Sequence, residues 1–108
     1  MTIEELQEQF WNEWQNTSNE DKLDWIHNNL PYHIKDMIPL SDGLHILQCM
    51  EAMVASLCGK HPAGEFVEAV LNNDLMAALD LADDVNQIVL RTYMLFIYNK
   101  VPHPLRRK

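Results

Sequence analysis

The chain has 108 residues, of which 47% are apolar, and a formal net charge of −8 at pH 7. The length predicts a single domain, and the apolar fraction excludes a disordered chain. The negative charge repels phosphate backbones and anionic headgroups, so it argues against nucleic-acid binding and against docking on a membrane surface.

The first helix is predicted to start at residue 3 and to fade over residues 15–17. Thr2 followed by Glu5 is a capping-box pattern, which marks the start of a helix. Apolar side chains then recur at helical spacing as far as Trp14, while glutamates occupy the other faces. The pattern therefore predicts an amphipathic helix with an acidic outer side.

A second helix is predicted to follow directly. Ser18 stands three positions before Asp21 and repeats the capping pattern. Pro31 is expected to end this helix, because proline lacks the backbone N–H and disfavours helix in the residue before it. One short turn of helix is expected in residues 31–38, ahead of Pro39.

The third helix is predicted to run from a cap at Ser41 or Asp42 to Cys58, with Gly59 as its stop. It is apolar on most sides, so we expect it at the centre of the fold. Its only polar strip is made by His45, Gln48, Glu51 and Ser56. Cys49 and Cys58 point to opposite sides of it, about 13 Å apart along the axis, which is too far for a disulfide.

Three further helices are predicted in the rest of the chain. Pro62 is expected in the first turn of one helix, because proline suits that position. Asp74 is expected to cap the next helix, and Asp83 or Asp84 the last, over residues 85–100.

These elements predict a compact all-α bundle of about six helices. One domain is expected over residues 1–101, followed by a basic, flexible tail over 102–108. Residues 85–100 are apolar on nearly every side, and a chain of this size can enclose only about one such helix. We therefore expect a homo-oligomer in which another copy covers residues 85–100.

Four motifs stand in order through the C-terminal half. Pro-x-Gly-x-Phe matches residues 62–66, Ala-Val-Leu-x-Asn-Asp-Leu matches 69–75, Ala-Asp-x-x-Asn matches 82–86, and Tyr-Asn-x-x-Pro matches 98–102. The stretch 61–102 thereby resembles a group of small bacteriophage and prophage proteins. The resemblance implies a phage-encoded accessory protein that acts in the cytoplasm of the bacterial host. It implies no mechanism.

The loop from residue 60 to residue 64 is the best candidate for a ligand site. Lys60 and His61 can supply positive charge, and the N-terminus of the following helix favours an anion. Gly64 lets a ligand approach the backbone, and asparagine can bind a base or ribose edge. The alternative interpretation is a plain connector between two helices. The predicted ligand-binding set is Lys60, His61, Gly64, Phe66, Asn73 and Arg91.

The N-terminal arm is the candidate protein-binding surface. Residues 1–36 carry eight acids and two lysines, and three tryptophans lie among them. Tryptophan is favoured at protein interfaces, and the acids suit a basic partner. The alternatives are ordinary core packing and, for the acids, imitation of DNA. The predicted partner-binding set is Glu8, Trp11, Trp14 and Trp25.

The sequence lacks the residue groupings that catalysis and metal binding need. No serine or cysteine stands in an activation motif, and the histidines and cysteines lack zinc-ligand spacing. Asp80, Asp83 and Asp84 share one helix face, but two of them are expected as caps. We therefore predict a non-enzymatic protein without a metal or cofactor.

Two function classes remain. The preferred one is a phage protein that binds a host defence protein through its N-terminal arm and inhibits or redirects it. The alternative is a small-molecule sponge that sequesters a host nucleotide immune signal in a pocket near residues 60–66.

Overall fold

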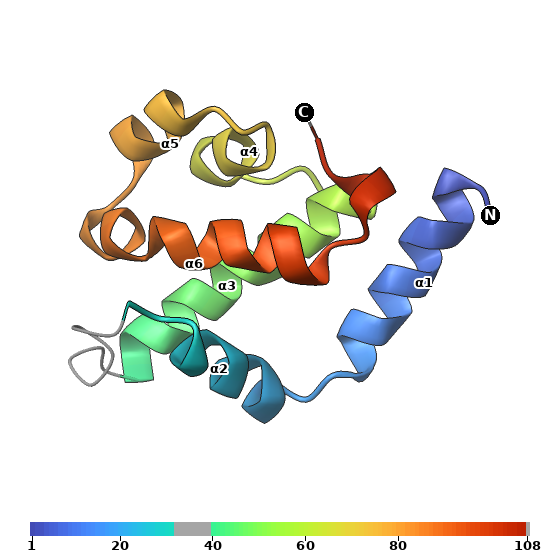
Figure 1. Cartoon of the computed structure of the whole chain (residues 1–108), viewed down its shortest axis with the longest axis horizontal. Coiled ribbons are helices and arrows are strands. Elements are labelled where there is room, and N and C mark those ends of the chain that lie inside the picture. Colours follow the sequence, from blue (N-terminus) through green and yellow to red (C-terminus); the bar gives the residue numbers. More distant parts are fainter. Residues whose placement is uncertain (32–39, 108) are drawn as a thin grey trace.

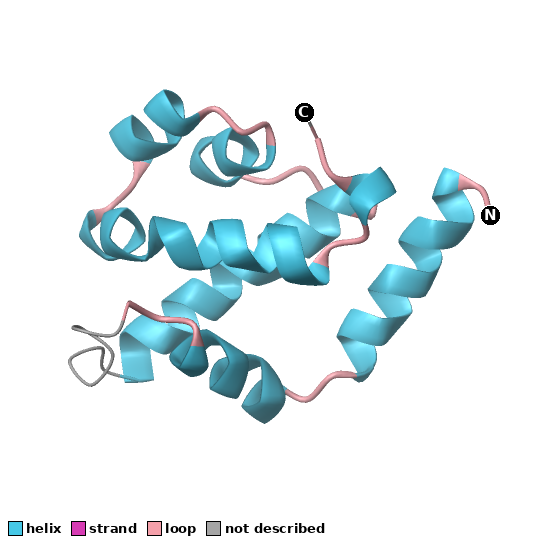
Figure 2. Ribbon diagram, in the orientation of Figure 1, coloured by secondary structure: helices cyan, strands magenta, loops and turns pink. Residues whose placement is uncertain are grey.

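A computed structural model describes residues 1–31 and 40–107 of the chain, and these residues form an all-α fold (Figures 1 and 2). The prediction of an all-α chain is therefore confirmed for the described residues. The short turn of helix expected in 31–38 lies outside them. The elements are α1 (Ile3–Asn16), α2 (Asn19–Asn28), α3 (Leu40–Leu57), α4 (Glu65–Leu71), α5 (Leu75–Leu81), α6 (Asp84–Lys100) and the 3₁₀ turn η2 (His103–Leu105).

The first two helices begin where their caps predict. The Thr2 side chain accepts from the N–H of Glu5, and the Glu5 carboxylate accepts from the N–H of Thr2, so the capping box is complete. The Ser18 side chain accepts from the N–H of Asp21 at the start of α2. This helix ends at Asn28, three residues before the proline that was expected to end it.

Helix α3 forms the centre of the fold, as its apolar pattern predicts. Ile46, Met50, Met53 and Val54 are among its fully buried residues. The helix begins at Leu40, so the two residues predicted as alternative N-caps lie inside its first turn, and that prediction is wrong.

The C-terminal end of α3 is closed by two backbone bonds across Gly59. The N–H of Gly59 donates to the backbone carbonyl of Ser56 (3.1 Å), and the N–H of Lys60 donates to the backbone carbonyl of Ala55 (2.8 Å). This is the Schellman arrangement, and it needs the positive φ of 72° that Gly59 adopts. The predicted stop at Gly59 is confirmed.

Helices α4 and α5 form a short hairpin. Helix α4 begins at Glu65 with Gly64 as its N-cap, so Pro62 lies in the preceding loop, and its predicted place in the first helical turn is wrong. The Asp74 side chain accepts from the N–H of Ala77 and caps α5, as predicted.

Helix α6 crosses α3, with the α4–α5 hairpin on one side and the α1–α2 elbow on the other (Figure 1). Asp83 is its N-cap, which decides between the two predicted alternatives. Its inner side is buried around Val89, Tyr93 and Phe96. Its outer side is open, with Ile88 51% and Tyr98 72% exposed.

The C-terminal segment packs against the bundle as far as Arg107, in contrast to the loose tail expected from residue 102. Leu105 in η2 is buried in the core. Arg107 donates to Glu68 of α4 (2.8 Å) and to Ser56 of α3 (2.8 Å). Leu105 and Arg107 therefore fix the C-terminal segment to the bundle, although its basic composition indicated a flexible tail.

Candidate functional site

A pocket opens between α1, α2, α3 and α6, with a cavity of about 280 Å³. We call it the aromatic pocket. The residues that line it are Phe10, Glu13, Trp14, Thr17, Asp21, Lys22, Trp25, Met50, Phe96 and Lys100. The pocket therefore includes two of the four predicted partner-binding residues, Trp14 and Trp25.

The walls of the aromatic pocket are held by edge-to-face ring contacts. The ring of Phe96 meets Trp14 at a centroid distance of 5.4 Å and an interplanar angle of 64°. It meets Trp25 at 5.7 Å and 72°. Both are the geometry in which aromatic pairs attract most. Trp14 is buried, as the core-packing alternative predicts, and Trp25 is half-buried.

A buried lysine lies at the base of the pocket. The Lys22 Nζ atom is 3.1 Å from Glu51 Oε1 and 4.2 Å from the centroid of the Trp14 ring. The Trp14 Nε1–H donates to Glu51 Oε2 at 2.6 Å. Glu51 thus compensates the buried cation and also satisfies the indole, so this part of the pocket is neutral.

We use the word rim for three exposed charged residues of the lining, which form no ion pair with one another. They are Glu13 of α1, Asp21 at the start of α2 and Lys100 at the end of α6. Helix α1 has four glutamates and no basic residue, so the surface that continues from the α1–α2 side is acidic.

The other two predicted partner-binding residues contact the predicted ligand loop. Lys60 Nζ is 3.2 Å from Glu8 Oε2 and 5.4 Å from the centroid of the Trp11 ring. The Gln7 side chain donates to the carbonyl of Leu57 at 2.9 Å, which fixes α1 against the end of α3. The N-terminal arm and the loop therefore form one continuous surface, although the sequence predicted them as separate sites for two alternative functions.

The remaining residues of the predicted ligand site are dispersed. Neither the aromatic pocket nor a second groove, on α6, is lined by any of residues 60–66, and Arg91 belongs to that second groove. Phe66 packs edge-on against Tyr93 at 6.0 Å, and Asn73 holds an exposed left-handed position with φ 59°. His61 and Gly64 are exposed. The positive charge of Lys60 is already paired with Glu8.

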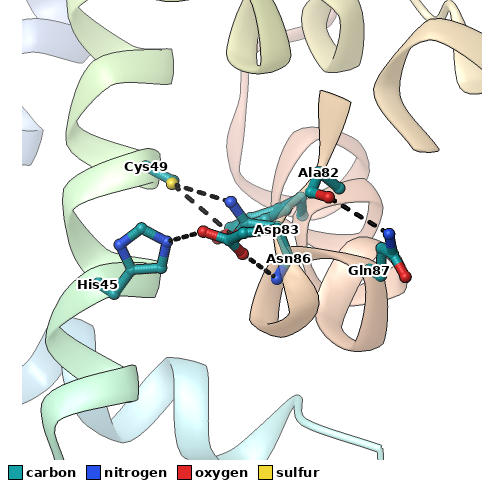
Figure 3. Close-up of polar contacts among 7 residues, drawn as sticks. His45, Cys49, Ala82, Asp83, Asn86 and Gln87 are labelled. Carbon is teal, nitrogen blue, oxygen red and sulfur yellow. Dashed lines mark hydrogen bonds and ion pairs between the residues drawn. The ribbon is translucent and has the colours of Figure 1, made fainter. Parts of the chain in front are cut away.

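A chain of polar side chains joins α3 to the start of α6 (Figure 3). Asp83 accepts from the N–H of Asn86 (2.8 Å), and its other oxygen is 2.9 Å from His45 Nε2. Asn86 accepts from the Tyr93 hydroxyl at 2.5 Å, and its amide lies 3.7 Å from the Cys49 sulfur.

These linked polar side chains hold α6 against α3. Burial, and secondarily the nearby Cys49, raises the pKa of Tyr93 far above its usual value, so the phenol stays protonated and donates to Asn86. Asn86 is buried and ties the start of α6 to α3 through Cys49, whereas Asn99 at the other end of α6 is exposed.

Both cysteines are free thiols, as their separation on α3 predicts. Burial is the largest influence on Cys58 and raises the pKa of its thiol; Lys60 lowers it and Glu8 raises it by smaller amounts. The thiolate is the reactive form of cysteine, so this environment suppresses reactivity at Cys58.

Sequence reasoning missed the eight lining residues other than Trp14 and Trp25, and it missed Glu51, which pairs with Lys22. Lys22 precedes Ile26 and Leu30 by four and eight positions, so it falls on the buried stripe of α2, and this spacing was the available signal. Glu51 was assigned to a polar strip of α3, with no sign in the sequence that the strip faces other helices.

Among residues 1–31 and 40–107, no three His, Cys, Asp or Glu side chains are grouped so as to hold a metal ion. Within the same ranges, none of the helices has both the length and the apolar character needed to cross a bilayer. Comparison of the chain with protein-family models, with curated proteins and with solved structures finds no match.

Proposed function

We propose that this chain is a phage-encoded accessory protein that acts in the cytoplasm of the bacterial host, without catalysis. In this proposal it binds a host defence protein and inhibits or redirects it. The binding surface is the acidic side of α1 and α2, which includes Glu8, Trp11 and the aromatic pocket. The observation that carries the proposal is this pocket, since it combines an aromatic lining, of which Trp25 is half-exposed, with the exposed carboxylates of Glu13 and Asp21.

Charge supports a basic partner. The first turn of α1 carries Glu4 and Glu5, and the first turn of α2 carries Glu20 and Asp21. At physiological ionic strength charges are screened over roughly 8 Å, so a cluster of this kind acts on a partner near contact and speeds its encounter. The binding should weaken as salt is raised.

The arrangement of the loop favours protein binding over the alternative, a sponge for a nucleotide immune signal. A nucleotide phosphate at Lys60 would have to displace Glu8, which already pairs with that lysine at 3.2 Å. Of the other residues proposed for that pocket, Asn73 lies beyond the end of α4 and Arg91 lies on α6, away from the loop.

The test is affinity capture from bacterial lysate with matched variants. Wild-type protein is expected to retain a discrete host protein at low salt and to lose it at high salt. A Glu8→Lys, Trp11→Ala variant should lose it, because both changes fall on the proposed surface. His61→Ala is the control, since the His61 side chain is exposed and lies outside the pocket.

Three results would contradict this proposal. One is the absence of any retained protein at low salt, and another is loss of the protein with His61→Ala alone. The third is native mass spectrometry of the purified protein that finds a bound species of a few hundred daltons, which would favour the nucleotide sponge. Lys60→Ala is a poor discriminator, because Lys60 contacts both Glu8 and Trp11.

We also propose that the chain self-associates through α6. Its outer side carries Ile88, Arg91, Leu95 and Tyr98 at spacings of three, four and three residues, the period of a two-helix seam. Arg106 flanks this side, since it donates to the carbonyl of Tyr98 at 2.6 Å. In an antiparallel pair of α6 helices that cross at the level of Tyr93, Ile88 of one copy would face Tyr98 of the other. Arg91 of one copy would then face Leu95 of the other, so the two Arg91 side chains stay apart.

Sedimentation velocity over a range of concentrations tests this association. The wild-type protein should show a dimer that Leu95→Glu converts to monomer. Met76→Glu, at an apolar residue of α5 that is 85% exposed, should leave the dimer intact. A wild-type chain that stays monomeric at the highest concentration would contradict the proposal.

A further inference from the structure

The size of the aromatic pocket limits what can enter it. A dry cavity of roughly 150 Å³ holds a benzene molecule, and pockets for drug-sized ligands run from about 300 Å³ upward. At about 280 Å³, this cavity has room for one large side chain such as an indole. A complete nucleotide would protrude from it.

The wall of the pocket matches an aromatic guest. Phe96 is the shared ring of both edge-to-face pairs, with Trp14 on one side and Trp25 on the other. A further ring entering from the open side can continue the same edge-to-face pattern, which adds to the stabilisation from burial alone. Phe10 and Met50 complete the apolar lining.

The charges around the pocket determine what flanks the guest. Lys22 is already compensated by Glu51, so it demands no anion from a ligand. Glu13 and Asp21 stand at the α1–α2 side of the rim, and a group approaching there meets negative charge. Lys100, at the end of α6, also lines the pocket, so Glu13, Asp21 and Lys100 together carry a net charge of −1. Phosphate groups would be disfavoured next to Glu13 and Asp21, whereas a lysine or arginine would be favoured.

We propose that the aromatic pocket receives one aromatic side chain of the partner protein, next to a lysine or arginine that pairs with Glu13 and Asp21. This inference rests on the proposed function, because it names the chemistry of the segment that the acidic surface binds. The aromatic residue supplies burial, and the basic residue supplies orientation and salt dependence.

Protein-detected NMR with short peptides tests the proposal. The probes are acetyl-Lys-Trp-Lys-amide, the matched peptide with alanine in place of tryptophan, and the matched peptide with glutamates in place of lysines. The first is expected to shift the indole N–H signals of Trp14 and Trp25. The other two should bind weaker by about tenfold or more, the weight of one well-buried contact.

A blocking variant locates the site. Thr17 is exposed at the end of α1 and lines the pocket, so Thr17→Phe should fill the mouth and abolish the shifts. Gln15→Phe adds the same ring at an exposed position of α1 outside the lining and should leave binding unchanged. Circular dichroism of both variants checks that the helices are retained.

The outcomes separate this inference from the proposed function. If the alanine peptide shifts the same signals as strongly as the tryptophan peptide, the aromatic specificity is wrong while capture by the acidic surface stands. If the tryptophan peptide leaves both indole signals unmoved at millimolar concentration, or binds Thr17→Phe as well as wild type, the pocket assignment is overturned. The Glu8→Lys, Trp11→Ala capture experiment decides the proposed function independently.

Discussion

Removal of Glu51 should be more damaging than removal of its partner Lys22. The Lys22 side chain is only 5% exposed, whereas that of Glu51 is 38% exposed. Glu51→Ala leaves a buried ammonium without its carboxylate and leaves the Trp14 indole without its acceptor. Lys22→Met removes the buried charge, keeps an apolar side chain of similar length, and leaves a glutamate that water can reach.

The magnitudes follow from this asymmetry. Breaking a fully buried pair from one side costs about 3–5 kcal/mol. Because Glu51 is more than a third exposed, solvent already screens the pair, so we expect about 2–3 kcal/mol for Glu51→Ala. Lys22→Met should cost about 0–1 kcal/mol, since replacement of a buried charge by an apolar side chain is often near neutral. The double variant should cost about 1 kcal/mol more than Lys22→Met, for the lost indole hydrogen bond.

Urea unfolding followed by tryptophan fluorescence measures all four free energies of unfolding, with equal slopes as the check on two-state behaviour. The decisive comparison is between the free energies of unfolding of the double variant and of Glu51→Ala. The double variant should be the more stable of the two, because it no longer contains an unpaired buried lysine. The reasoning is refuted if Lys22→Met costs as much as Glu51→Ala, or if the double variant loses the sum of the two. Glu13→Gln, at the exposed rim, is the control and should change stability by less than about 0.5 kcal/mol.

Three further predictions concern the backbone and the buried titratable groups. Gly59→Ala should destabilise by about 1 kcal/mol in urea unfolding, because the φ of Gly59 is 72°. Gly64→Ala should change stability less, because Gly64 has a φ of −68° and open space around it, so the lower entropy of the unfolded chain offsets the weaker N-cap. The pKa of Tyr93 is raised on folding, so its contribution to stability is complete below about pH 10 and is lost as the pH rises beyond that. Tyr93→Phe should therefore lose less stability than wild type between neutral and strongly alkaline pH. Equal losses would argue against a raised pKa at Tyr93. The raised pKa and burial of Cys58 predict slow reaction with Ellman's reagent in the native protein and fast reaction in urea; a fast native reaction of both thiols would contradict this.

The polar strip of α3 illustrates how tertiary contacts give a local pattern its meaning. Sequence reasoning identified His45, Glu51 and Ser56 only as the polar side of an otherwise apolar helix. In the structure each of the three bonds to a different part of the chain: His45 to the cap of α6, Glu51 to the buried cation of α2, and Ser56 to Glu68 and Arg107. The strip therefore connects helices, which is why a central helix can carry it.

Most of the secondary structure followed from the sequence alone, because it depends on local chemistry. Caps at Thr2, Ser18 and Asp74 satisfy N–H groups within three residues, and Gly59 supplies a backbone angle that other residues resist. The prolines were less reliable guides. Helix α2 ended before its proline, and Pro62 preceded its helix without joining it.

The candidate site was determined by the tertiary structure. Lys22, Met50 and Phe96 are separated by tens of residues, and only the crossing of α2, α3 and α6 brings them into one pocket. The same packing places Lys60 against Glu8 and Trp11, so the N-terminal arm and the loop 60–64 form one surface, although the sequence predicted two separate sites. Helical periodicity identifies which side of a helix is buried, but the helix that covers that side depends on side-chain packing across the whole chain.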